Sequence, residues 1–122
     1  MVKKTSTCLL ALMMVICLLT ACAAKASVTV QVIQNGTLTL EKTYRTNAAT
    51  LEELLLAHEK ELGAVLTDSD YGKFVEGMNG VVADPDKREF YSVGIDGEEA
   101  AVGIHEIALA DGACYQFTLT NY

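Results

Sequence analysis

The fold is decided largely by residues 27–63, which read SVTVQVIQNGTLTLEKTYRTNAATLEELLLAHEKELG. Apolar and polar residues alternate in the first half of this stretch, on both sides of Asn35-Gly36. That dipeptide readily adopts the positive φ angles of a tight hairpin turn. The pattern therefore predicts a two-stranded antiparallel hairpin over 27–44.

The second half of the stretch has the signals of a helix. Thr50 and Glu53 have the spacing of a capping box, in which each side chain satisfies a free backbone N–H at the helix start. Leucines then recur at helical spacing, and Gly63 is suited to end the helix. We expect a helix between Thr50 and Gly63, with its leucines buried and its glutamates in solvent.

The rest of the chain predicts a loop over 63–72 and then short strands separated by turns. Strands are expected at 74–78, 81–82, 90–95 and 114–120, with a short return strand at Ala101-Val102. One helix among several short strands indicates the α+β class. The expected architecture is a sheet of about four to six short strands with one α-helix covering one face.

The first 21 residues predict a signal peptide. Lys3 and Lys4 precede an unbroken apolar run from Cys8 to Leu19, and small residues follow it. This run of about 12 residues would extend about 18 Å as a helix, well short of a hydrocarbon core of about 30 Å. A cleaved leader is therefore favoured over a permanent transmembrane helix.

Leu19-Thr20-Ala21-Cys22 resembles the lipobox of bacterial lipoproteins. In that family the cysteine is thioether-linked to diacylglycerol and becomes the first residue after cleavage. The resemblance implies lipidation at Cys22, a tether over 22–26, a domain over 27–122, and attachment to the extracytoplasmic face of a bacterial cell membrane. The alternative is an ordinary signal peptide with incidental cysteines.

Charge and cysteine content narrow the function classes. The chain is 51% hydrophobic yet carries a net charge of −7, and because Lys3 and Lys4 lie in the leader, the remainder is more acidic still. An acidic domain is a poor partner for phosphate backbones, so no nucleic-acid partner is expected. Beyond Cys22 only Cys114 remains, which excludes an internal disulfide and a cysteine metal cluster in the mature domain.

No residue set suited to catalysis is evident, so the protein is not expected to be an enzyme. The chain has two histidines: His58 falls near the apolar stripe of the helix, and His105 lies in a glycine-rich connection. The carboxylate pairs around Ser69 and Pro85 lack the spacing of a calcium loop and suit turns better. No metal site is predicted.

Three segments, taken in order, carry a family resemblance across about 28–119. They are the helix opening Thr50-Leu51-Glu52-Glu53-Leu54-Leu55, the stretch from Tyr71-Gly72 to Asn79-Gly80-Val81, and Tyr91-Ser92-Val93-Gly94-Ile95-Asp96-Gly97 followed by Val102-Gly103-Ile104 and Leu109-Ala110-Asp111-Gly112. Together they resemble the transcobalamin C-terminal-like domain family, found largely in bacterial surface lipoproteins. The family is similar to the β-grasp-like domain that caps cobalamin in vertebrate carriers.

The resemblance implies a β-grasp-like fold and capture of a small ligand at the cell surface, with a cobalamin-like corrinoid as the best-known ligand class. Tyr71 and Tyr91 are the candidate ligand contacts, because both are expected beside loops where a ring could stack on a ligand. Packing within the sheet is the alternative role for these tyrosines, and Phe74 and Phe117 are expected in the core. The alternative function for the whole domain is that of a structural or interaction module, which docks another surface protein and binds no small ligand.

Overall fold

A computed structural model describes residues 26–122 and begins with the predicted hairpin. Strand β1 (Ala26–Gln34) pairs antiparallel with β2 (Thr37–Thr46). Asn35 and Gly36 both have positive φ angles at the turn, as their sequence predicts. The alternation of β1 places Val28, Val30 and Val32 in the core and leaves the polar residues between them on the outer face.

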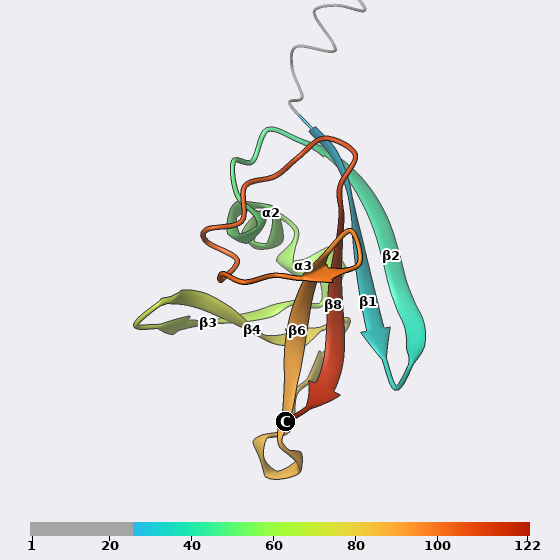
Figure 1. Cartoon of the computed structure of the whole chain (residues 1–122), viewed down its shortest axis with the longest axis vertical. Helices are drawn as coiled ribbons and strands as arrows, with labels where there is room; N and C mark the ends of the chain where they lie inside the picture. Colours follow the sequence, from blue (N-terminus) through green and yellow to red (C-terminus); the bar gives the residue numbers. More distant parts are fainter. Residues whose placement is uncertain (1–25) are drawn as a thin grey trace, which may run out of the picture.

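Five strands form the larger sheet, in the order β2-β1-β8-β6-β7 (Figure 1). The other three are β6 (Glu89–Ile95), β7 (Glu98–Glu99) and β8 (Cys114–Asn121). Strands β1 and β8 run parallel, and every other neighbouring pair is antiparallel. The two ends of the domain sequence therefore meet at the centre of one sheet.

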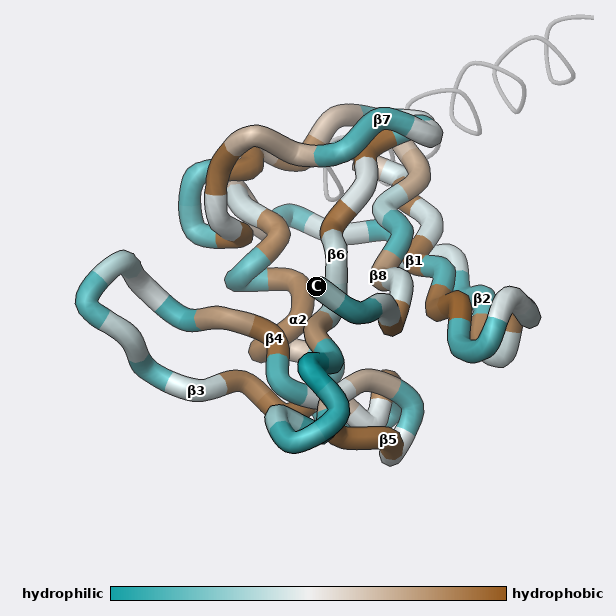
Figure 2. The backbone as a smooth tube through the Cα atoms, turned by 60° about the horizontal axis from the view of Figure 1, so that its bottom comes forward, coloured by the Kyte–Doolittle hydropathy of each residue, from teal (hydrophilic) through white to brown (hydrophobic). Residues whose placement is uncertain are grey.

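A second sheet of three strands, in the order β3-β4-β5, lies beside the first (Figure 2). These strands are β3 (Val65–Ser69), β4 (Gly72–Met78) and β5 (Val81–Val82). A 3-10 helix, η1 (Pro85–Lys87), leads from β5 into β6. In Figure 1 the β3–β4 hairpin projects sideways from the body of the domain.

The helical segment is split in two, α2 (Leu51–Ala57) and α3 (Glu59–Leu62), with a break at His58. Thr50 caps the helix as predicted, since its Oγ1 accepts from the backbone N–H of Glu53 at 3.3 Å. The return bond of the capping box is displaced by one residue: Glu53 Oε2 accepts at 2.7 Å from the N–H of Ala49, the residue before the N-cap. Gly63 ends α3 in the left-handed conformation.

One hydrophobic core lies between the inner face of the larger sheet, the helical segment and the smaller sheet. Its fully buried side chains come from all three: Val28, Val30, Val32, Leu51, Leu54, Leu55, Leu62, Met78, Tyr115 and Phe117. The helical leucines and Phe117 are thus placed as the sequence predicts. Packing of this mixed set is what holds the two sheets together.

The predicted fold class was wrong. Residues 26–122 form eight strands in two sheets, and not one sheet of four to six strands packed by one α-helix. The error arose over 63–72, which was predicted as a loop but contains β3. The side chains of β3 are mostly exposed, so this strand lacks the apolar alternation by which strands are recognised in sequence.

A smaller correction concerns the strand that follows β6. The Asp96-Gly97 turn is present, but the return strand is Glu98–Glu99 and not Ala101-Val102. Two glutamates can pair here because β7 is an edge strand with both side chains in solvent.

In the part of the chain that the structure describes, no helix has the length and apolar character needed to cross a bilayer. The predicted signal peptide and the lipidation at Cys22 lie outside the described residues.

Candidate binding groove

An apolar groove lies where the smaller sheet meets the larger one, between β4 and β6. Its volume is about 300 Å³, at the lower end of the range for small-molecule sites. The lining residues come from β4, from the β5–β6 connection, from β6 and from the last residue of the sequence: Phe74, Val75, Glu76, Val82, Ala83, Pro85, Glu89, Phe90 and Tyr122. We call this the β4–β6 groove.

Two phenylalanines, Phe74 and Phe90, line the groove with side chains that remain exposed. On β4 the side chains of Val75 and Met78 are buried in the core, whereas Phe74 remains 49% exposed. On β6 Phe90 remains 38% exposed. Large aromatic side chains left this accessible, and close to each other, are typical of a binding surface.

The rim of the groove is held by contacts between η1 and the end of β8. The N–H of Tyr122 donates to the Arg88 carbonyl at 3.0 Å, and Asn121 Nδ2 donates to the Lys87 carbonyl at 2.8 Å. The Tyr122 ring lies 5.9 Å from the Phe90 ring and 5.0 Å from the Arg88 guanidinium carbon. The rim thus adds a third aromatic ring to the groove.

The charged residues that line the β4–β6 groove are acidic. The N–H of Asp84 donates to Glu89 Oε1 at 2.9 Å, so Glu89 both lines the groove and fixes the β5–β6 connection. The Glu76 side chain also lines the groove, on β4. Carboxylates in this position favour a neutral or cationic ligand that can donate hydrogen bonds.

A smaller hollow of about 160 Å³ adjoins the groove and shares Phe74, Val75 and Phe90 with it. Lys73 lies at its edge, where Nζ donates to Asp68 Oδ1 at 2.7 Å. The hydrogen bond to Asp68 raises the pKa of Lys73 above its usual value, so its ammonium group stays charged. The two hollows together form one continuous apolar strip.

Tyr91, one of the two predicted ligand contacts, is a core residue with 7% of its surface exposed. Its hydroxyl donates to the Val81 carbonyl at 2.7 Å and accepts from Gln34 Nε2 at 3.0 Å. Gln34 is itself buried and also donates to the Met78 carbonyl at 2.9 Å. Tyr91 therefore ties the two sheets together and contributes only part of one wall of the smaller hollow.

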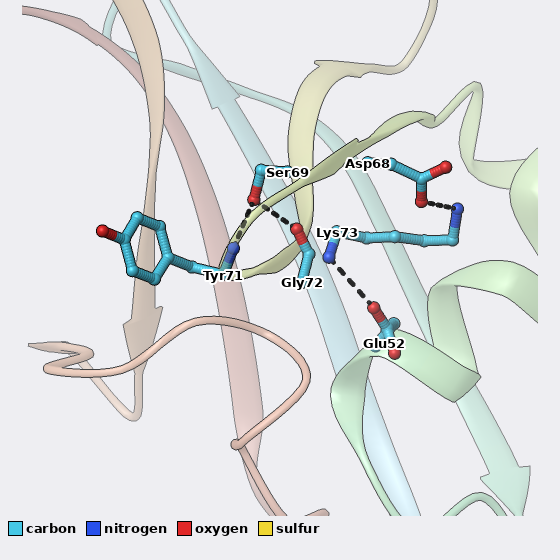
Figure 3. A network of polar contacts seen from close by, with 6 residues as sticks. All are labelled: Glu52, Asp68, Ser69, Tyr71, Gly72 and Lys73. Atoms are coloured by element: carbon cyan, nitrogen blue, oxygen red, sulfur yellow. Dashed lines mark hydrogen bonds and ion pairs between the residues drawn. The ribbon is translucent and has the colours of Figure 1, made fainter.

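Tyr71, the other predicted contact, lies at the tip of the β3–β4 hairpin with 87% of its surface exposed. Figure 3 shows its ring directed away from a polar network that secures the hairpin to α2. In that network Ser69 Oγ accepts from the Tyr71 N–H at 3.2 Å and donates to the Gly72 carbonyl, and the Lys73 N–H donates to Glu52 Oε1 at 3.3 Å. Tyr71 lines neither of the two hollows.

Neither histidine lines the groove. The His105 ring packs against Gly72, where an added Cβ would lie 2.7 Å from Nδ1, and that nitrogen is buried without a hydrogen-bond partner. The His58 ring stacks on Tyr44 with centroids 4.0 Å apart. Among residues 26–122, no three side chains of the His, Cys, Asp and Glu types converge as a metal site would require.

The groove residues were not predicted as a site. Phe74 was expected in the core, and this expectation was wrong because Phe74 lies on the same side of β4 as Glu76, opposite Val75. The sequence did contain a signal for this: period-two alternation places Phe74 on the same side of the strand as the charged Glu76. Nothing in the sequence indicates that Tyr122 and Phe90 meet, because their contact depends on the pairing of β6 with β8.

The fold defines a class: a small, mostly β domain of two sheets. No known protein family and no curated protein sequence matches the chain. A protein from Ruminococcus gnavus, named for a proposed metal-binding role, matches with a TM-score of 0.73 and 23% identity over 80% of this chain and 99% of its own. Haptocorrin in complex with Cbi matches with a TM-score of 0.63 and 18% identity.

These likenesses establish a shared fold. The haptocorrin match covers 80% of this chain but only 25% of haptocorrin, so the chain corresponds to one part of that larger protein. The expected link to the transcobalamin-like carriers is thus supported at the level of the fold.

Proposed function

We propose that this protein is a non-catalytic binding domain that captures a small, largely apolar ligand in the β4–β6 groove, outside the cell and tethered to the membrane through a lipid at Cys22. The observation that carries the proposal is the exposed aromatic wall of Phe74, Phe90 and Tyr122 at the junction of the two sheets.

A corrinoid is the ligand class that fits the groove and the fold likeness best. Its ring edge would lie against the aromatic wall, and its amide groups could donate to Glu76 and Glu89. No histidine is positioned in the groove to ligate cobalt, because the His105 ring is held against Gly72. Binding would therefore rest on stacking and hydrogen bonds made by the chain.

The size of the groove limits what this domain can do alone. A groove of about 300 Å³ holds one edge of a corrinoid and leaves the rest of the ring in solvent or against a partner. The haptocorrin match, which covers a quarter of that protein, is consistent with a domain that closes over a ligand held elsewhere.

Titration of the full-length lipoprotein in mild detergent with cobinamide, cobalamin and haem tests the proposal. We expect a saturable change in the visible spectrum with at least one corrinoid, and about tenfold or weaker binding for Phe74→Ala and Phe90→Ala, since each removes a stacking ring. Leu38→Ala is the matched control, because Leu38 is equally exposed but lies on β2, away from the groove. No saturable change with any of the three compounds would contradict corrinoid binding.

The second candidate function is docking of another surface protein, and Tyr71 favours it. A tyrosine that is 87% exposed at the tip of a projecting, well-braced hairpin resembles an anchor residue of a protein interface. Cross-linking on intact cells distinguishes the two functions: docking predicts one dominant protein adduct without added ligand, which Tyr71→Ala abolishes and Phe74→Ala leaves unchanged.

A further inference from the structure

Strand β2 is an unpaired edge of the larger sheet. Among the described residues it pairs only with β1, so one side of its backbone has no strand partner. The pairing with β1 shifts register between Val32 and Ile33, but from Leu40 to Thr46 it is regular. A long regular edge of this kind is a template for another strand unless charges or bulges prevent pairing.

We propose that the β2 edge pairs with the β2 edge of a second copy of this chain, antiparallel about a two-fold axis at Thr43. Thr43 is the midpoint of the regular segment 40–46, so this register uses the whole of it. Pairing would join two five-stranded sheets into one continuous sheet, with the β4–β6 groove of each copy left open. The proposal does not depend on what the groove binds.

The charges on the outer face of β2 select this register. When Thr43 faces Thr43 of the second copy, Glu41 of each copy lies opposite Arg45 of the other, because residues equally far from the axis are paired. Directly opposite side chains in an antiparallel pair have Cβ atoms about 5 Å apart, which suits an ion pair. The geometry produces this pair twice, once on each side of the axis.

Both side chains are available for these contacts. Both are exposed, and within residues 26–122 the Arg45 side chain has no hydrogen bond or ion pair. Glu41 accepts from Gln31 Nε2 at 2.7 Å through Oε2, which leaves its other carboxylate oxygen available. The Arg45 guanidinium group is therefore not paired with a carboxylate within residues 26–122.

The neighbouring registers are disfavoured by like charges. A shift that centres the axis on Glu41 places the Glu41 carboxylates of the two copies opposite each other. A shift that centres the axis on Lys42 does the same with the two Lys42 ammonium groups. An axis at Tyr44 loses both Glu41–Arg45 pairs. The pattern of β2 is therefore self-complementary in one register, which is why a second copy is the expected partner.

Charge reversal tests the proposal. Sedimentation equilibrium of the full-length protein in mild detergent should show a dimer. Glu41→Arg alone or Arg45→Glu alone should weaken it about tenfold or more, because each turns two attractive pairs into repulsive ones. The double variant E41R/R45E should restore the wild-type dimer. Glu98→Arg, on β7 at the opposite edge of the same sheet, is the matched control and should have no effect.

A disulfide at the axis gives an independent test. Opposing Cα atoms in an antiparallel pair lie about 4.5–5.5 Å apart, within the range that a disulfide spans. In a Cys114→Ser background, Thr43→Cys should form a covalent dimer on mild oxidation in intact cells. Leu38→Cys, on the same face of β2 but outside the paired segment, should not.

Three results would overturn the proposal: a monomer at all concentrations, a dimer that survives both single reversals, or folded single variants whose loss of dimer the double variant does not restore. Far-UV circular dichroism establishes that each variant is folded. Loss of corrinoid binding would not bear on this proposal, because the groove and the β2 edge share no residues.

Discussion

At the scale of single residues, Tyr91 shows how a side chain that resembles a ligand contact in sequence can serve the core instead. Its hydroxyl links the carbonyl of Val81 on the smaller sheet to Gln34 on the larger one. Tyr91 does lie on a strand, β6, where the sequence predicts one. Its burial follows from the packing of β6 against the smaller sheet, which only the tertiary structure reveals.

Tyr91→Phe is therefore expected to reduce stability and leave ligand affinity nearly unchanged. Removing the hydroxyl takes a donor from the part-buried Val81 carbonyl and an acceptor from the buried Gln34 amide, which costs about 1–3 kcal/mol of the free energy of unfolding. Urea denaturation followed by circular dichroism measures the loss. Tyr71→Phe is the control and should change stability by less than about 0.5 kcal/mol, since its hydroxyl is in solvent. Equal effects of the two substitutions would contradict this assignment.

Tyr44 is the residue with the clearest shift in acidity. Burial, together with its hydrogen bond and charge interaction with Glu61, raises the pKa of Tyr44 from 10.0 to about 12. The phenol donates to Glu61 Oε2 at 3.0 Å, and its ring stacks on His58. These contacts connect β2 to the helical segment.

The shift predicts the direction of the pH dependence of stability. Because the folded state holds the phenol proton more tightly than the unfolded state, the stabilising contribution is fully present below pH 10 and is lost as the pH rises from 10 through about 12. Glu61→Gln should lower the pKa of Tyr44 but not return it to 10, because burial remains the largest cause. Phenolate absorbance measures the titration. Glu59→Gln, on the same helical segment, should leave the Tyr44 titration unchanged.

At the scale of elements, the junction between α3 and the β4–β5 turn joins the helical segment to the smaller sheet. The N–H of Asn79 donates to the Leu62 carbonyl at 2.7 Å, and the N–H of Gly80 donates to the Gly63 carbonyl at 3.1 Å. Gly63 has φ +56°, and a Cβ built there would lie 2.5 Å from the Gly80 nitrogen. The helix ends at glycine for two reasons: its conformation and the close approach of another backbone.

Gly63→Ala should therefore destabilise the domain more than Gly80→Ala does. Gly80 also has a positive φ, but a Cβ there meets nothing within 4 Å, so its substitution costs only the conformational strain of about 1–2 kcal/mol. At Gly63 the backbone must also move, which adds about 1–3 kcal/mol. Thermal or urea unfolding of the two variants measures the difference. Equal losses would mean that the close approach is relieved without cost.

At the scale of the whole molecule, the proposed attachment to a membrane depends on the N-terminal segment. Cys22→Ser should prevent lipidation and move the protein from the membrane fraction to the aqueous phase in a detergent partition. The physical reason is that diacyl chains gain about 0.8 kcal/mol for each methylene buried in the bilayer. Cys17→Ser, within the leader, is the control and should stay membrane-bound. An unchanged mass and distribution for Cys22→Ser would contradict lipidation.

The local elements were determined largely by the sequence alone. The Asn35-Gly36 hairpin, the Thr50 helix cap and the Gly63 helix stop were predicted correctly, because each depends on residues close together in the chain. Their physical causes are backbone φ preferences and short-range hydrogen bonds, which act in any tertiary context. The resemblance to transcobalamin-like domains likewise agrees with the haptocorrin likeness at the level of the fold.

The two-sheet arrangement and the groove were decided only by the tertiary structure. Strand β3 has little apolar alternation and is formed through its pairing with β4. Strand β8 pairs parallel with β1, although the two strands are far apart in the sequence. The same long-range pairing brings Tyr122 to Phe90 and leaves Phe74 in solvent. Periodicity shows which residues share a side of a strand, but which side is covered depends on what packs against it, and that is a property of the assembled sheets.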